Sequence, residues 1–257
     1  MRVIVTRPAA QAAAWVASFR AWGIDAAALP LIDIVPPADT APVQRAWAEL
    51  PRYALLFFVS ANAVRHFFEL RPQGLAWPPG TRSAAPGPGT AAALMAQGLP
   101  AALVVGPAPD AGSFDSEAIW ERLRTDDWAG REVLVVRGED GRDWLAEQLR
   151  GAGAALHFVA AYARRPPSLT PEGRHVLSEA AQAPRGHLWL FSSSEAVRHL
   201  QALWPEGVPA GARALATHPR IAQAAQQAGF AEVGLTGPEA ESVRLALQGA
   251  PLQSASP

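Results

Sequence analysis

The sequence predicts an α/β protein built from two five-stranded parallel sheets with helices packed on their faces. Three observations lead to this prediction. Short apolar runs alternate with helix-patterned stretches along the whole chain, which is typical of parallel sheets covered by helices. The chain resembles itself at a spacing of about 131 residues, and two Pro-rich segments interrupt the alternation. A length of 257 residues suits two domains of ordinary size.

Ten apolar runs are expected to form strands, because most are rich in Val, Ile, Leu, Phe or Ala and are bounded by Gly, Pro, Ser or Asn. In chain order they cover residues 2–6, 26–32, 53–59, 81–85, 101–105, 131–136, 154–160, 187–191, 211–216 and 231–235. Between most of them lie stretches of about ten residues or more with the apolar spacing of amphipathic helices. Two sheets accommodate this number of strands better than one.

The internal repeat consists of four matched features that occur in the same order in both halves. The pairs are 3–23 with 133–153, 59–67 with 192–200, 87–99 with 218–230, and Gly106-Pro107 with Gly237-Pro238. Self-similarity at one spacing favours duplication of a structural unit. The alternative is that similar βα units converge on similar sequences.

Two extended, Pro-rich segments, 32–42 and 161–171, are candidates for crossings between the two halves. Proline fixes its own φ and restricts the residue before it, so both segments should be stiff connectors. They favour an interleaved chain that crosses twice. A contiguous split near residue 130 stays open, although no comparable Pro-rich break occurs there.

Composition excludes several chemistries. The chain has no Cys, and all 22 basic residues are Arg. Thiol nucleophiles, disulfides, thiolate metal sites and lysine Schiff bases are therefore excluded. A net charge of −1 gives no strong field toward nucleic acid or anionic membranes. No apolar run approaches the length of a membrane span, and the N-terminal segment lacks a signal-peptide core, so a cytoplasmic protein is expected.

The polar residues that could bind a ligand follow the predicted strands. Ligands of open parallel sheets bind outside the carboxyl ends of the strands. Helix N-termini present free N–H groups there and suit an anionic ligand. The candidate substrate-binding residues are Thr6, Arg7, Ser60, Ala61, Asn62, Gly87, Thr90, Arg137, Gly138, Arg142, Ser192, Ser193, Ser194, Thr217 and His218.

Simpler interpretations of these residues stay open. Ser60, Asn62 and the serines at 192–194 are preferred helix N-caps. Gly87 can belong to a tight turn, and Arg137 and Arg142 can form surface ion pairs. The six histidines show no metal-ligand spacing, and no nucleophile elbow of the Gly-x-Ser-x-Gly type is present.

Several short motifs, in order and spacing, resemble the uroporphyrinogen-III synthase (HemD) family over about residues 2–247. They read VIVTRP, SANAV, GPGTAAAL, VVRGEDGR, AYARRP, FSSSEAV and HPRIAQAAQQAGF. One departure concerns the family's Gly-Pro-x-Thr turn, which is often repeated in both halves. The second copy here begins at His218 and has no hydroxyl aligned with Thr90.

The resemblance implies two flavodoxin-like lobes joined by a two-stranded connector, with the substrate held between the lobes. Lobe 1 would combine residues 1–34 and 168–257, and lobe 2 would cover 38–160. The connectors would be 33–37 and 161–167.

The resemblance also implies an activity. A cyclising hydro-lyase of tetrapyrrole biosynthesis would convert linear hydroxymethylbilane to uroporphyrinogen III, with loss of water and inversion of ring D. No metal and no organic cofactor are expected. The partner would be a small-molecule substrate with eight carboxylates, which Arg side chains and helix N-termini can bind. A cytoplasmic monomer is implied, with transient contact to hydroxymethylbilane synthase and with neither nucleic acid nor membrane as a partner.

Tyr162 matches the family's connector tyrosine and is the candidate catalytic residue. A phenol is protonated at neutral pH and could donate its proton to the leaving hydroxyl. The alternative is that Tyr162 only packs between the lobes. Two other functions stay open for the whole chain: a cytoplasmic two-lobed binding module that closes on a small molecule, and a synthase-like regulatory domain without catalysis.

Overall fold

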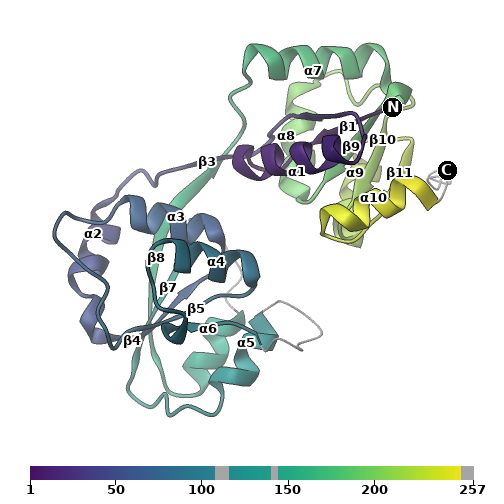
Figure 1. The fold of residues 1–257 in the computed structure, drawn as a ribbon. Helices are drawn as coiled ribbons and strands as arrows, with labels where there is room; N and C mark the ends of the chain where they lie inside the picture. The colour runs from purple at the N-terminus through teal and green to yellow at the C-terminus, as the bar shows by residue number, and fades with distance from the viewer. Residues whose placement is uncertain (108–115, 140–143, 250–257) are drawn as a thin grey trace. The chain divides into compact units, whose positions relative to one another are not determined.

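The computed structural model describes residues 1–107, 116–139 and 144–249, and it divides into two compact units (Figure 1). Unit 1 comprises Met1–Asp33 together with the chain from Arg165 onward, and unit 2 comprises Ile34–Arg164. Unit 1 is therefore discontinuous in sequence, whereas unit 2 is continuous.

Unit 1 contains a five-stranded sheet in the order β11-β10-β9-β1-β2. All four neighbouring pairs are parallel. The strands are β1 (Arg2–Val5), β2 (Ala26–Ala28), β9 (His187–Phe191), β10 (Arg213–Ala216) and β11 (Glu232–Leu235). The helices are α1 (Ala9–Ala21), α7 (Pro171–Gln182), α8 (Ser194–Leu203), α9 (Pro219–Gln227) and α10 (Ala240–Gly249).

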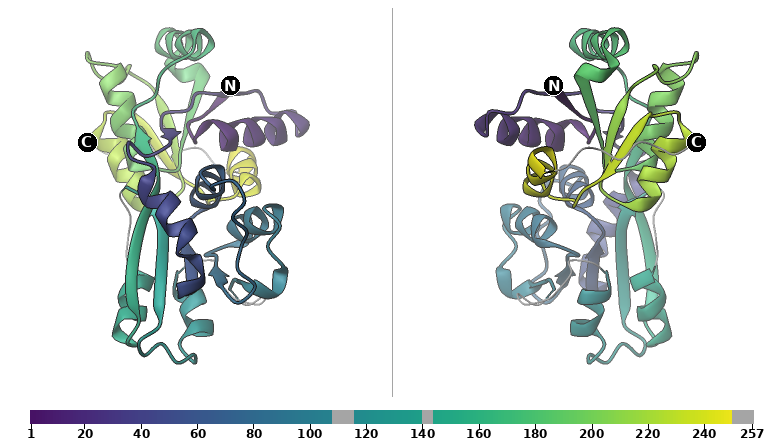
Figure 2. Two further views of the ribbon diagram at one scale, coloured as in Figure 1. Left: turned by 90° about the vertical axis from the view of Figure 1, so that its left-hand side faces the viewer. Right: turned by 90° about the vertical axis from the view of Figure 1, so that its right-hand side faces the viewer.

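Helices cover both faces of this sheet (Figure 2). On one face α1 and α10 pack together, and Phe19 and Val243 bury their side chains against strand residues such as Val5 and Leu190. On the other face α8 packs against α9. Because both faces of the sheet are covered, the central strands β1, β9 and β10 are apolar after their first residue rather than alternating.

Unit 2 contains a six-stranded sheet in the order β3-β8-β7-β4-β5-β6. The pairs from β8 to β6 are parallel. The strands are β3 (Asp33–Val35), β4 (Tyr53–Phe58), β5 (Arg82–Ala84), β6 (Val104–Val105), β7 (Glu132–Gly138) and β8 (Ala155–Arg165). The helices are α2 (Ala41–Ala48), α3 (Ala61–Glu69), α4 (Pro88–Ala96), α5 (Ser116–Leu123) and α6 (Trp144–Gly151), with 3-10 turns at Leu50–Arg52, Ala101–Leu103 and, in unit 1, Pro184–Gly186.

Two separate clusters form the core of unit 2, one on each face of the sheet. The cluster under α2, α3 and α4 contains Trp47 and Phe67, whose rings stack at 4.9 Å. The cluster under α5 and α6 contains Trp128, and the indole Nε1–H donates to the Leu123 carbonyl at 2.7 Å. Both large indoles are almost fully buried.

The predicted α/β class with parallel sheets is confirmed, and three details of the strand prediction differ. The sheet of unit 2 has six strands rather than five, because β3 is hydrogen-bonded to β8. β8 runs to Arg165, through residues assigned above to a connector, since the first proline follows only at Pro166. The strand predicted at 101–105 is a 3-10 turn followed by the short β6.

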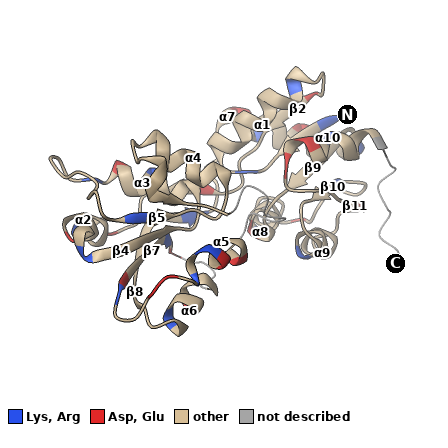
Figure 3. Cartoon of the chain, turned by 60° about the horizontal axis from the view of Figure 1, so that its bottom comes forward, with Lys and Arg blue, Asp and Glu red and all other residues tan. Residues whose placement is uncertain are grey.

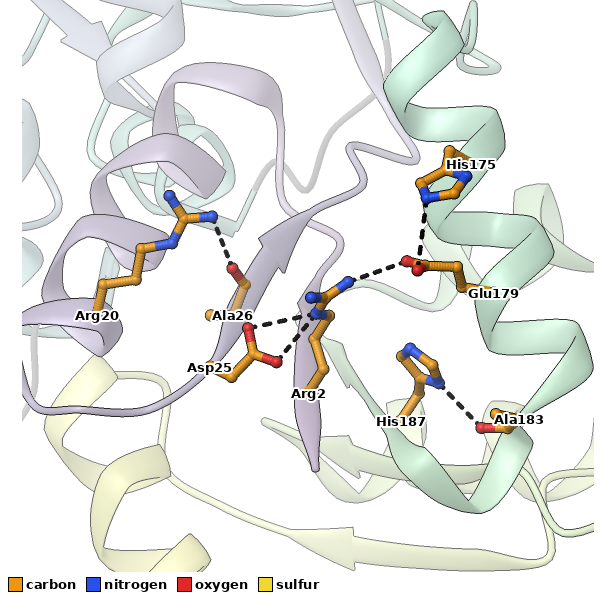
Figure 4. A network of polar contacts seen from close by, with 8 residues as sticks. All are labelled: Arg2, Arg20, Asp25, Ala26, His175, Glu179, Ala183 and His187. Carbon is orange, nitrogen blue, oxygen red and sulfur yellow. Dashed lines mark hydrogen bonds and ion pairs between the residues drawn. The ribbon is translucent and has the colours of Figure 1, made fainter.

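Ion pairs join the strands of each sheet at its amino edge. In unit 1, Arg2 at the start of β1 pairs with Asp25 at 3.1 Å and with Glu179 of α7 at 2.9 Å (Figure 4). In unit 2, Arg52 donates to Glu132 at 2.7 Å, and His157 lies 2.9 Å from the same carboxylate. Basic and acidic residues are otherwise spread over helices and strands of both units (Figure 3). No helix within the described parts of the chain is long and apolar enough to cross a membrane.

Candidate functional site

The predicted ligand-binding residues of unit 1 follow β1, β9 and β10, which are neighbours in the sheet. The register pairs Val5 with Leu190 and Ala216 with Phe191, so the three strands end at the same level. The structure therefore brings Thr6-Arg7, the serines 192–194 and Thr217-His218 to one edge of one sheet.

Two threonines at this edge are tied to neighbouring backbone. The Thr6 side chain is buried, and its hydroxyl donates to the Leu190 carbonyl at 2.7 Å. The Thr217 backbone N–H donates to the Phe191 carbonyl at 3.1 Å. Thr6 therefore joins β1 to β9, and its hydroxyl proton is engaged within the protein.

Arg7 is half-buried beside this edge. Its guanidinium lies 4.1 Å from the centre of the Trp15 ring and donates to the Pro238 carbonyl at 2.9 Å. Burial lowers the pKa of Arg7 from its usual value, and the nearby Glu239 carboxylate opposes that shift. The buried Arg7 Nε–H has no acceptor among the described residues. A partly desolvated cation with a spare donor is suited to a carboxylate ligand.

Capping accounts for some of the polar groups and not for others. Ser193 caps α8 by accepting from Glu195 N–H at 3.2 Å, and His218 caps α9 by accepting from Arg220 N–H at 3.1 Å. Ser194 is the first residue of α8, and its buried hydroxyl has no partner among the described residues. Thr236, directly after β11, also has a buried hydroxyl without a partner among the described residues. The sequence interpretation missed Thr236, although a hydroxyl directly after a predicted strand was the available signal.

In unit 2, the candidate residues sit where β4 and β5 lead into helices. Ser60 caps α3 by accepting from Ala63 N–H at 3.2 Å. Ala61 and Asn62, both half-buried, are the first two residues of that helix. Gly87 is the N-cap of α4, and Thr90 is buried in its first turn.

The end of β7 holds the next two candidates. The Arg137 guanidinium lies 5.2 Å from the centre of the Phe158 ring. Gly138 is the last residue of the strand and is buried. Arg142 lies outside the described residues.

Tyr162 belongs to β8, inside unit 2, and is 6% exposed. Its ring is part of the core cluster under α3, within unit 2. The phenol oxygen nevertheless lies 3.5 Å from the Ser60 hydroxyl, and either oxygen can donate. Tyr162 therefore combines a packed ring with a hydroxyl at the carboxyl edge of the sheet.

His66 is a residue of this region that the sequence interpretation left unassigned. It is buried on α3, and its ring centre lies 6.0 Å from that of Tyr162. Nε2 lies 3.0 Å from Arg65 Nη2 and Nδ1 lies 3.0 Å from Glu69 Oε2. Because guanidinium can only donate, Nε2 is the acceptor and Nδ1 carries the proton. Burial lowers the pKa of His66, which favours the neutral imidazole, and the nearby Glu69 carboxylate opposes that shift.

A hollow at the opposite, amino edge of the unit 2 sheet holds none of the predicted residues. It is lined by residues that include Arg52, Tyr53, Thr81, Arg131 and Glu132. Arg52 and Glu132 pair with each other across it. In residues 1–107, 116–139 and 144–249, no cluster of three His, Asp or Glu side chains could hold a metal ion.

The fold and the strand ends define a class of protein. It is a parallel α/β protein in which, within each unit, hydroxyl groups, helix N-termini and a half-buried arginine lie at the carboxyl ends of the strands. The family model described as uroporphyrinogen-III synthase HemD matches residues 13–242. The chain belongs to the uroporphyrinogen-III synthase family.

Relatives agree with this assignment, and solved structures resemble the chain in fold. The uroporphyrinogen-III synthase of Salmonella typhimurium is 28% identical over 174 residues, 64% of this chain and 65% of that protein. The Synechococcus elongatus synthase is 29% identical over 199 residues, 77% of this chain and 72% of its own. The match thus spans just under two thirds of the Salmonella protein. In fold, the chain resembles a mutant synthase from Thermus thermophilus (TM-score 0.57, 19% identity, 97% of this chain and 100% of that one) and the synthetase from Helicobacter pylori (TM-score 0.57, 17% identity, 96% and 99%).

Proposed function

We propose that this chain is a uroporphyrinogen-III synthase, which cyclises hydroxymethylbilane to uroporphyrinogen III with loss of water and inversion of ring D. The observation that carries the proposal is the family match over residues 13–242. The position of Tyr162 supports it, because the one candidate acid has its hydroxyl 3.5 Å from Ser60 at a strand end.

The chemistry requires little from the protein beyond one proton and a controlled geometry. Tyr162 donates its proton to the leaving hydroxyl, the C–O bond breaks and water departs, leaving the tyrosinate and a reactive azafulvenium cation. The substituted carbon of ring D attacks it to form a spiro intermediate. That intermediate opens and recloses with ring D inverted, and the proton lost from the reclosed ring restores the phenol. The net change is loss of one water.

Selectivity is then a matter of positioning. Closure without inversion needs no catalyst, so the protein must favour the spiro transition state over direct closure. The substrate carries carboxylates along its length. Arg7 offers a spare buried N–H, and Ser194 offers an unpartnered hydroxyl, at the carboxyl edge of unit 1. We assign to these groups the binding of substrate carboxylates.

The test is the identity of the product. Hydroxymethylbilane is generated in situ, the protein is added, and the porphyrin isomers are resolved after oxidation. A synthase yields mainly the type III isomer. Only type I, from spontaneous closure, would overturn the proposal.

The same assay addresses the alternatives. A binding or regulatory module without catalysis forms no type III isomer in it. In keeping with the proposed activity, the partner is a small molecule, the expected location is the cytoplasm, and contact with hydroxymethylbilane synthase is testable by adding that enzyme in coupled assays.

A further inference from the structure

The pairing of β7 with β8 contains one extra residue, next to Tyr162. Arg137 pairs with Ala160, and the next residue, Gly138, pairs with Tyr162, so Ala161 is passed over. Successive residues of a regular strand point to opposite faces of the sheet. Here Ala161 and Tyr162 are both buried in the same core cluster. The extra residue therefore turns Tyr162 onto the face that α3 covers, as β-bulges do when they redirect a side chain.

Gly138 lies where the Tyr162 ring needs space. A Cβ on Gly138 would lie 2.9 Å from Cε2, 3.0 Å from Cζ and 3.3 Å from the hydroxyl oxygen of Tyr162. Carbon atoms pack best at about 3.5–4.0 Å. The backbone itself does not require glycine, because Gly138 is not among the glycines with a positive φ. The absence of a side chain at Gly138 therefore makes room for the Tyr162 ring.

The ring has little freedom to yield. Glu139 N–H donates to the Tyr162 carbonyl at 3.1 Å, which ties the end of β7 to the tyrosine backbone. The ring is buried among core side chains and lies beside the His66 imidazole. A methyl group on Gly138 would therefore displace the phenol by roughly half an ångström or more.

We propose that Gly138 is a positioning residue for Tyr162: it leaves the space that places the phenol oxygen beside Ser60. This differs from the direct substrate contact that the sequence suggested for Gly138. The catalytic consequence rests on the proposed function, whereas the packing relation does not.

The packing relation is tested by NMR. The chain has only two tyrosines, Tyr53 and Tyr162. Protein labelled with 3-fluorotyrosine gives two ¹⁹F resonances, which Tyr53→Phe assigns. Gly138→Ala should shift the Tyr162 resonance and leave that of Tyr53 unchanged. Gly151→Ala is the matched control, because nothing lies within 4 Å of a Cβ there. An unchanged Tyr162 resonance in Gly138→Ala overturns the proposal.

Kinetics test the catalytic consequence. Gly138→Ala should lower kcat about 10- to 100-fold and leave KM within about twofold, because only the placement of the acid changes. In a Tyr162→Phe background the same substitution should cause no further loss of kcat. Equal losses in both backgrounds would overturn the positioning role. If the wild-type protein forms no type III isomer, the proposed function fails while the NMR result still decides the packing relation.

A stability cycle covers the case in which Gly138→Ala folds poorly. Removing the ring should relieve the crowding, so Gly138→Ala should lower the Tm of the wild type and leave that of Tyr162→Ala nearly unchanged. The same decrease in both backgrounds contradicts the proposal.

Discussion

At the residue scale, the arginines at the two ends of β1 differ in whether their donors are already used within the protein. Arg2 at the start of β1 is held by two carboxylates, whereas Arg7 just past its end keeps a buried N–H without an acceptor in the described chain. An ion-paired arginine contributes little to binding because its donors are used. Arg7 is therefore the cation of β1 that we assign to the substrate.

Tyr162→Phe isolates the hydroxyl from the ring. The ring keeps its place in the core, so the free energy of unfolding should change by only about 1 kcal/mol. Loss of the proposed general acid should lower kcat about 10²- to 10⁴-fold. The isomer-resolved assay and urea unfolding measure the two effects. Tyr53→Phe is the control and should retain activity. Wild-type turnover by Tyr162→Phe would reject the proton-donor role.

His66 makes the stability of unit 2 depend on pH. Burial holds its pKa below the value of about 6.5 that histidine has in an unfolded chain. As the pH falls below that value, the unfolded chain binds a proton that the folded chain does not, so stability decreases. His66→Asn should therefore lose less stability between pH 7.5 and 5.5 than the wild type does. Urea unfolding at both pH values measures this, with His175→Asn at an exposed position as control. Identical pH dependence in wild type and His66→Asn would contradict the assignment.

At the element scale, two helix caps separate structural from functional hydroxyls. Ser60 caps α3 and Thr170 caps α7, each by accepting a backbone N–H at 3.1–3.2 Å. Replacing either by Ala should cost about 0.5–2 kcal/mol of stability. Only Ser60→Ala should also lower kcat, because only Ser60 lies beside the Tyr162 hydroxyl. Thermal unfolding and isomer-resolved kinetics on both variants check this. Equal kinetic effects, or none, would remove Ser60 from the site.

Element type could be predicted where the apolar run is long and bounded by caps. The run at 53–59 corresponds to β4, which is followed directly by the Ser60 cap and α3. The extent of β8 could not be predicted, because the prolines after Arg165 resemble a connector although the backbone pairs with β7 up to Tyr162. Ser60 and Tyr162 could be proposed as site residues from the sequence, and the structure places their hydroxyl oxygens 3.5 Å apart. The space that Gly138 leaves for the Tyr162 ring could not be predicted. It depends on a one-residue shift in the pairing of β7 with β8, and no local sequence pattern indicates such a shift.

At the scale of the whole molecule, each described hydrophobic core is formed by residues of a single unit. The cluster under α1 and α10 draws only on residues of unit 1, and both clusters of unit 2 draw only on residues within Ile34–Arg164. Stability of one unit should therefore not require the core of the other. A fragment with the bounds of a unit should therefore keep its cores intact. A fragment that ends at the boundary of the sequence repeat, near residue 130, should not.

Two fragments test whether the cores of the two units are independent. Residues 33–165 keep all six strands of the unit 2 sheet and both of its clusters, in a length typical of a domain. Residues 1–130 lose β7 and β8 from that sheet, and they also lose β9, which lies between β1 and β10. We expect fragment 33–165 to unfold cooperatively in urea and fragment 1–130 to show no cooperative transition.

Tryptophan fluorescence is the measurement, because Trp47 and Trp128 are nearly inaccessible to solvent in the folded unit. Trp47 reports on the core on one face of the sheet, and Trp128 reports on the core on the other face. Near-UV circular dichroism on both fragments is the second probe, since coincident transitions identify two-state unfolding. Cooperative unfolding of fragment 1–130 would mean that the strands across residue 130 are dispensable, and the contiguous arrangement would return. A non-cooperative fragment 33–165 would mean that unit 2 depends on unit 1, contrary to the separation of their cores.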